Sequence, residues 1–154
     1  MNNFQIERIL RSDNRTRKSF VGVFSSNTLP ENPKIPSLLV ANTSPSGHPG
    51  THWILFYLKK DKFIYFDSLA GNFENYSDHF TKFVCKNLKG RKFVANSERL
   101  QAYNSNVCGH YVIFCSYWLC RGWPLKKIVR RLASVKKISA RDSLVKEFVI
   151  NLCK

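Results

Sequence analysis

The chain has 154 residues, enough for one domain with its own core and too few for two. Hydrophobic residues make up 44% of it and aromatic residues 14%, which excludes a disordered tail and favours a folded globular domain spanning residues 1–154. The formal net charge of +15 attracts polyanions or acidic partners but does not bear on the fold.

The apolar pattern, followed along the chain, predicts strands first and then helices around a central helix, which is an α+β fold. The expected helices cover residues 3–11, 73–90, 109–122, 125–134 and 141–153. The expected strands lie within residues 19–30, which end in a loop, and over 37–43, 52–58, 63–67 and 91–96.

Two of these elements carry stronger signals than the rest. The runs at 52–58 and 63–67 are almost continuously apolar and are joined by a short polar turn, which predicts a hairpin buried on both faces. The run at 109–122 is apolar on every side, which predicts a helix in the middle of the domain. Ser139 with Asp142 resembles a capping box for the last helix.

No apolar run is long enough to span a bilayer, and the first residues lack the apolar centre of a signal peptide. We therefore expect an intracellular protein that is neither secreted nor bound to a membrane.

The five cysteines form no CxxC pair and show no spacing typical of a metal site, so each is expected to be a small buried hydrophobe unless another argument makes it reactive. No metal site is expected.

Cys108 stands where a polar, turn-like segment changes into the buried helix. A thiol at a helix N-terminus meets unpaired backbone N–H groups and the positive end of the helix dipole, which lowers its pKa. Asn104, Ser105 and Asn106 offer capping side chains, and Gly109 offers room for a substrate backbone. The alternative is that Cys108 is merely the first core residue of its helix.

A nucleophilic thiol needs a base, and His52 opens the first strand of the hairpin beside Trp53. Asp67 ends the partner strand, where a carboxylate can orient the imidazole as the third member of a triad. Gln101 can supply a side-chain N–H to an oxyanion hole, together with the Cys108 backbone N–H. Taken singly, His52 reads as a structural histidine, Asp67 as a turn cap and Gln101 as a polar loop residue.

Four segments resemble adenain, the adenovirus maturation protease, and together cover most of residues 19 to 121. They are "FVGVFSSNTLP", "GTHWILFYL", "IYFDSLAG" and "QAYNSNVCGHYVIFC". The order of His52, Asp67, Gln101 and Cys108 is also that of the wider clan of ubiquitin-like-protein proteases, and the opening segment is similar to adenain-like proteases of Maverick/polinton-type DNA transposons and related viruses. Two departures are that adenain carries Glu where this chain has Asp67, and that adenain is longer.

The resemblance implies a papain-like fold in the permuted adenain/SUMO-protease arrangement, with a sheet packed on the nucleophile's helix. It implies a cysteine endopeptidase with Cys108 as nucleophile, His52 as base, Asp67 as orienter and Gln101 in the oxyanion hole. Implied substrates are capsid or virion precursors cut after Gly-containing sites, in the host nucleus or the virion. The resemblance also implies DNA or an activating peptide as a cofactor, although Cys85 does not align with the cysteine that would bind such a peptide. A monomer is expected.

Two other functions use the same residues or the same charge. One is a deubiquitinase-like or SUMO-protease-like isopeptidase, and the other is a basic DNA-binding protein that has the fold without catalysis. The densest basic stretch lies at 125–141, where four cations share one face of the predicted helix and form a candidate nucleic-acid-binding patch. They are Lys126, Lys127, Arg130 and Arg131. The alternative is a solvated face that keeps the protein in solution.

Overall fold

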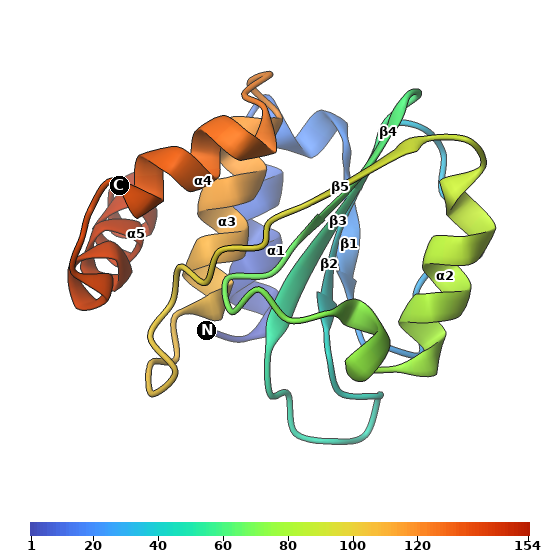
Figure 1. Cartoon of the computed structure of the whole chain (residues 1–154), viewed down its shortest axis with the longest axis horizontal. Helices are drawn as coiled ribbons and strands as arrows, with labels where there is room; N and C mark the ends of the chain where they lie inside the picture. The colour runs from blue at the N-terminus through green and yellow to red at the C-terminus, as the bar shows by residue number, and fades with distance from the viewer.

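A five-stranded mixed sheet forms the centre of the protein, in a computed structural model that describes residues 1–154 (Figure 1). The strands are β1 (Phe20–Phe24), β2 (Ser37–Asn42), β3 (Trp53–Leu58), β4 (Lys62–Phe66) and β5 (Lys92–Ala95). They follow one another across the sheet in chain order. The β2–β3–β4 centre is antiparallel, and the edge strands β1 and β5 are parallel to their neighbours. The predicted hairpin is therefore confirmed as β3 and β4.

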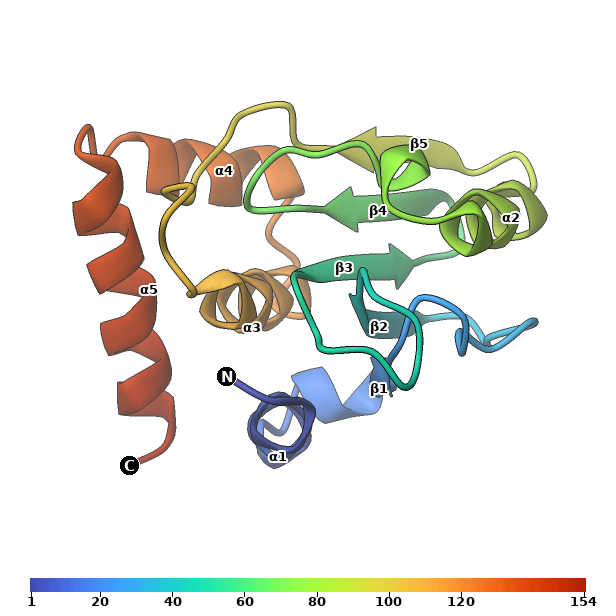
Figure 2. The same ribbon diagram turned by 90° about the horizontal axis from the view of Figure 1, so that it is seen from below.

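Helices cover both faces of the sheet, so that the protein has three layers (Figure 2). They are α1 (Asn3–Ser12), α2 (Asp78–Leu88), α3 (Cys108–Leu119), α4 (Leu125–Ala133) and α5 (Ile138–Leu152). Helix α2 lies alone on one face, while α1 and α3 lie against the other, with α4 and α5 packed around α3. No helix is both long and apolar enough to cross a membrane.

The burial of β2 and β3 on both faces explains their continuous apolar sequences. Alternate side chains of a strand point to opposite sides of a sheet. In β3, Leu55 and Tyr57 join the core under α1 and α3, whereas Ile54, Phe56 and Leu58 join the core under α2. Helix α3 is buried along most of its length because other helices enclose the sides that the sheet leaves free. The predicted central helix is thus confirmed.

Two local predictions are wrong. The helix expected from residue 73 begins only at Asp78, where the Ser77 side chain caps it, and residues 73–75 form a separate 3₁₀ turn. The capping box of Ser139 with Asp142 does not form, because α5 already begins at Ile138. The Asp142 carboxylate instead accepts a hydrogen bond of 2.8 Å from the buried hydroxyl of Tyr111 on α3, so that tertiary packing takes precedence over the local cap.

Phe56 in β3 is the centre of an aromatic cluster between the sheet and α2. Its side chain is fully buried, and four rings have centroids within 6 Å of its own. They belong to Phe63, Tyr65, Phe80 and Phe83. Aromatic pairs of this kind add to the free energy gained by burying apolar surface.

We expect Phe56→Ala to lower the free energy of unfolding by about 3–5 kcal/mol, because it leaves a cavity among rings that cannot close over it. The matched control is Phe4→Ala, since Phe4 is 81% exposed on α1 and should change stability by less than about 0.5 kcal/mol. Urea unfolding followed by circular dichroism measures both. Equal stability of the two variants would contradict this account of the core.

Candidate active site

The hairpin places His52 opposite Asp67. In the antiparallel ladder Leu55 of β3 pairs with Phe66 of β4, so the residue after β4 lies beside the start of β3. His52 precedes β3 directly, and its Nε2 is 2.6 Å from Oδ1 of Asp67. Both side chains are buried. The strand register therefore joins a histidine and a carboxylate that are 15 positions apart in the sequence.

The Asp67 carboxylate is completely buried and is satisfied on both oxygens. Oδ1 accepts from the backbone N–H of Leu69 at 2.8 Å as well as facing His52. Oδ2 accepts from the backbone N–H of Gly71 at 2.9 Å and from the Tyr76 hydroxyl at 2.7 Å. Such a set of donors stabilises the ionised carboxylate, so Asp67 is held in one orientation toward the imidazole.

Tyr76 falls within the helix expected over residues 73–90 but contacts the site instead. It lies just before α2, and its ring is near that of His52, with centroids 5.9 Å apart. Gly71 makes room for it, because a Cβ at Gly71 would lie 2.1 Å from the Tyr76 hydroxyl oxygen. The glycine four residues after Asp67 was the only sign of this contact in the sequence. Its spacing alone does not reveal that Tyr76 is the residue it accommodates.

Cys108 begins α3, as predicted, and its side chain lies beside that of His52. The capping side chains expected at Asn104, Ser105 and Asn106 do not cap this helix. Val107 is the N-cap residue, and no side chain makes a capping hydrogen bond. The backbone N–H groups of His110 and Tyr111 donate to the Val107 carbonyl, and that of Gly109 faces the Cys108 sulfur. The N–H of Cys108 itself has no acceptor within the protein, so it is the donor that remains for an oxyanion.

His52, Asp67 and Cys108 change one another's proton affinity. Burial alone would lower the pKa of His52, but hydrogen bonding to Asp67 and to Cys108 outweighs it and raises the pKa to about 9. Burial alone would raise the pKa of Cys108, but the adjacent His52 outweighs it and the pKa is lowered. The pKa of Asp67 is likewise lowered by His52 and Tyr76 in spite of burial. The arrangement favours a thiolate beside an imidazolium.

Gln101 lies in the same cleft and is held from two sides. Its Oε1 accepts from the Ser68 hydroxyl at 2.7 Å, and its Nε2 donates to the backbone carbonyl of Ser105 at 2.8 Å. A side-chain amide carries two N–H groups, so one donor of Gln101 is not used by Ser105. The structure thus brings together all four residues that the sequence selected for this site.

The cleft around the thiol has a volume of about 290 Å³, with Met1 and Trp53 on one side and Leu69 and Tyr103 among its other walls. The Trp53 indole N–H donates to the backbone carbonyl of Met1 at 3.2 Å. Met1 occupies the space that Gly109 was expected to offer a substrate. A Cβ added at position 109 would lie only 3.2 Å from the Cβ of Met1. Close packing of Met1 therefore explains why position 109 has a residue without a side chain.

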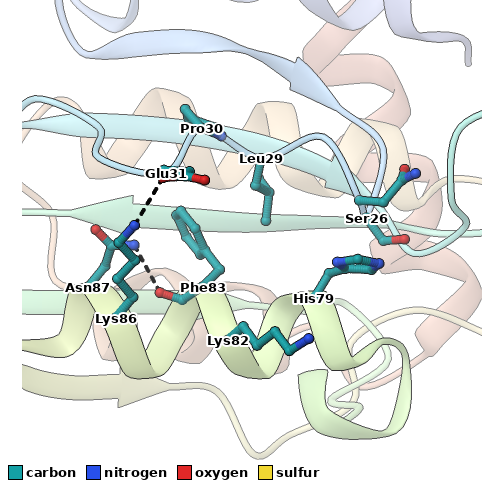
Figure 3. Close-up of a pocket in the computed structure, with 10 residues that line it drawn as sticks. Ser26, Leu29, Pro30, Glu31, His79, Lys82, Phe83, Lys86 and Asn87 are labelled. Carbon is teal, nitrogen blue, oxygen red and sulfur yellow. Dashed lines mark hydrogen bonds and ion pairs between the residues drawn. The ribbon is translucent and has the colours of Figure 1, made fainter.

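The other three histidines lie elsewhere. His110 is on α3, and its Nδ1 is buried without a hydrogen-bond partner. His48 lines a separate polar hollow with Asn42 and Ser44. His79 borders a third hollow, between α2 and the connection from β1 to β2 (Figure 3). None of them lies in the cleft with Cys108, so His52 alone has the position that a base requires.

The cysteines outside the cleft have different surroundings from Cys108. Cys115 is fully buried, and burial raises its pKa well above the usual range. Burial also raises the pKa of Cys120, to about 11. Cys85 and Cys153 are exposed, and no cysteine forms a disulfide. The expectation that every cysteine other than a reactive one is buried is therefore wrong for these two.

The four basic residues of the predicted patch are all exposed on α4. Leu125, Ile128 and Leu132 of the same helix are buried, as the predicted face required. The four cations nevertheless face two different hollows, since Lys126 lines one with strand lysines, and Lys127, Arg130 and Arg131 line another against α3. Nothing in this arrangement selects DNA over other anions.

Comparison with known proteins supports the fold. No protein-family model matches the chain, and no curated protein sequence matches it. Among solved structures, the chain is similar to ChlaDub1 from Chlamydia trachomatis, with a TM-score of 0.51 and 17% identity. The match covers 76% of this chain and 58% of that one, so the chain spans little more than half of its neighbour's length. The likeness confirms the expected fold, an α+β domain with a papain-like arrangement. Membership of the ubiquitin-like-protein protease clan, and of the adenain group within it, stays a prediction.

We expect Asp67→Asn to lower the pKa of His52 by more than about one unit, because burial then acts on the imidazolium without its carboxylate partner. The imidazolium is consequently deprotonated at a lower pH than in the native protein. Titration of the imidazole by NMR measures the change. Cys85→Ala, on the exposed side of α2, is the control and should leave the pKa of His52 as it was. An unchanged pKa in the Asp67 variant would show that the carboxylate is not its cause.

Proposed function

We propose that the protein is a cysteine peptidase of the thiolate–imidazolium type, with Cys108 as nucleophile. The observation that carries the proposal is the juxtaposition of His52, 2.6 Å from a fully buried Asp67, with a thiol at the start of α3. The raised pKa of His52 and the lowered pKa of Cys108 support it, because both shifts favour the thiolate–imidazolium pair over the neutral pair.

The chemistry follows from these positions. The Cys108 thiolate attacks the carbonyl carbon of the scissile bond, and the oxyanion is stabilised by the Cys108 backbone N–H and by the free N–H of Gln101. The His52 imidazolium gives its proton to the leaving amine, and a thioester remains on Cys108. Neutral His52 then takes a proton from water, the hydroxide formed displaces the sulfur, and the thiolate and imidazolium are restored. Asp67 keeps the imidazole oriented throughout.

Two classes of substrate are compatible with this proposed activity. The resemblance to adenain supports an endopeptidase that processes capsid or virion precursors after Gly-containing sites. The fold likeness to ChlaDub1, a deubiquitinase, supports the second candidate, an isopeptidase acting on ubiquitin or a ubiquitin-like protein. A cleft of about 290 Å³ around the thiol suits small substrate residues next to the scissile bond in either case.

Cys108→Ala should abolish hydrolysis of a peptide substrate, by at least about a thousandfold, and leave the thermal unfolding temperature nearly unchanged. The matched control is Cys85→Ala, which should keep full activity because Cys85 is exposed and far from the cleft in sequence and fold. Labelling by a thiol-reactive peptide probe should be lost in the first variant only. Turnover by the Cys108→Ala protein would end this mechanism.

A cleavage-site profile on a peptide library distinguishes the two substrate classes. We expect cuts after Gly in short, unstructured peptides, because an endopeptidase needs only the residues that fill its cleft. The comparison substrates are fluorogenic conjugates of ubiquitin and of a SUMO protein. Efficient cleavage of a conjugate with no cutting of the library would favour the isopeptidase and reject the endopeptidase.

A further inference from the structure

A hollow of about 560 Å³ lies between α3, α4 and α5, away from the catalytic cleft. Its apolar wall includes Phe114 and Trp118 of α3, Leu132 of α4 and Leu144 of α5. Leu144 is 38% exposed, so an apolar side chain borders the opening. The volume lies within the range of clefts that bind a ligand or the side chains of a partner.

The rim of the hollow is cationic and unpaired. Lys127, Arg130 and Arg131 line it, no acidic residue does, and none of the three forms a salt bridge within the protein. Elsewhere Arg121 is paired with Asp13, which shows that the chain does neutralise some of its cations internally. The rim is therefore complementary to carboxylates, and the wall below it to an apolar side chain.

The Trp123 ring of the hollow is not free to stack on nucleic-acid bases. The Trp118 and Trp123 rings lie against each other with centroids 4.2 Å apart, and the Lys127 ammonium is 3.8 Å from the Trp123 centroid. Two groups this close to one ring must lie on opposite faces, so both faces of Trp123 are covered. Single-stranded nucleic acid binds through open aromatic faces, which Trp123 does not provide.

Trp118 adds an unsatisfied donor. Its indole N–H is buried and has no hydrogen-bond acceptor within the protein, although Trp118 lines the hollow. Because that nitrogen is itself buried, it offers a partner no direct contact. A partner that brings carboxylate oxygens together with an apolar side chain is complementary to the rim and to the wall of the hollow.

We propose that the hollow between α3, α4 and α5 is a docking site for an acidic, amphipathic segment of a partner protein. The segment inserts an apolar side chain between Leu132 and Leu144, and its carboxylates pair with Lys127, Arg130 and Arg131. Such helix-in-groove binding uses apolar residues on one face and charges beside them. The site is at the opposite end of α3 from Cys108, about 15 Å along the helix, and does not depend on the proposed peptidase activity.

The test uses the full chain carrying Cys108→Ala, so that a probe cannot be cleaved, with the native protein in parallel. The probe is a fluorescein-labelled peptide of Leu, Ala and Glu, roughly 18 residues long and able to form an amphipathic helix. Two matched peptides have Ser in place of Leu or Lys in place of Glu. Fluorescence anisotropy at physiological salt should show at least about tenfold tighter binding of the first peptide than of either control.

The site is checked by charge reversal. Arg130→Glu with Arg131→Glu should weaken binding of the acidic apolar peptide at least about tenfold, because repulsion replaces attraction at the rim. The matched control is Lys136→Glu with Lys137→Glu, which changes the net charge equally at exposed positions outside the hollow and should have less than about a threefold effect. Leu144→Arg, which changes one partly exposed side chain, should also weaken binding and serves if the double variant does not fold.

Three outcomes would overturn the proposal. Equal binding of the Leu and Ser peptides would show attraction by charge alone, without an apolar pocket. A random DNA duplex that binds more tightly than the peptide and displaces it would make the α4 surface a nucleic-acid site. Absence of peptide binding even at low salt would remove the hollow as a docking site. Loss of peptidase activity in the native protein would instead concern Cys108 and leave this inference untouched.

Discussion

The buried Asp67 carboxylate is the constraint on which the site depends. A carboxylate with no solvent contact is unfavourable unless charge and hydrogen bonds compensate for its lost hydration. Leu69, Gly71, Tyr76 and His52 together supply those partners. The same contacts that make the burial tolerable also fix the imidazole and raise its pKa, so structural stability and chemical competence rest on one group.

The layered fold gives that group its surroundings. The β3–β4 hairpin is buried on both faces, which puts its polar ends at the edge of two cores, one under α2 and one under α3. Tyr76 reaches Asp67 from the α2 side, whereas Cys108 reaches His52 from the α3 side. The site therefore forms only when both layers pack against the same strands.

Helix α3 connects two surfaces of different chemistry. Its N-terminus faces the cleft, where polar groups and a thiol converge, and its C-terminal half supplies aromatic side chains to the hollow beside α4. A single buried helix thus carries a reactive group at one end and an apolar wall at the other. The separation allows a partner to bind at the second surface without entering the first.

The sequence by itself determined the elements with regular patterns and the residues with distinctive chemistry. Apolar runs identified β2, β3, β4 and α3, because such runs are stable only inside a core, and the order of His52, Asp67, Gln101 and Cys108 indicated one site. Only the tertiary structure decided what depends on contacts between distant segments. Tyr76 donates a hydrogen bond to Asp67 instead of lying within a helix. Asp142 accepts a hydrogen bond from Tyr111 instead of capping α5. Met1 fills the space beside Gly109. Such contacts are set by the register and packing of segments far apart in the chain, which local spacing does not encode.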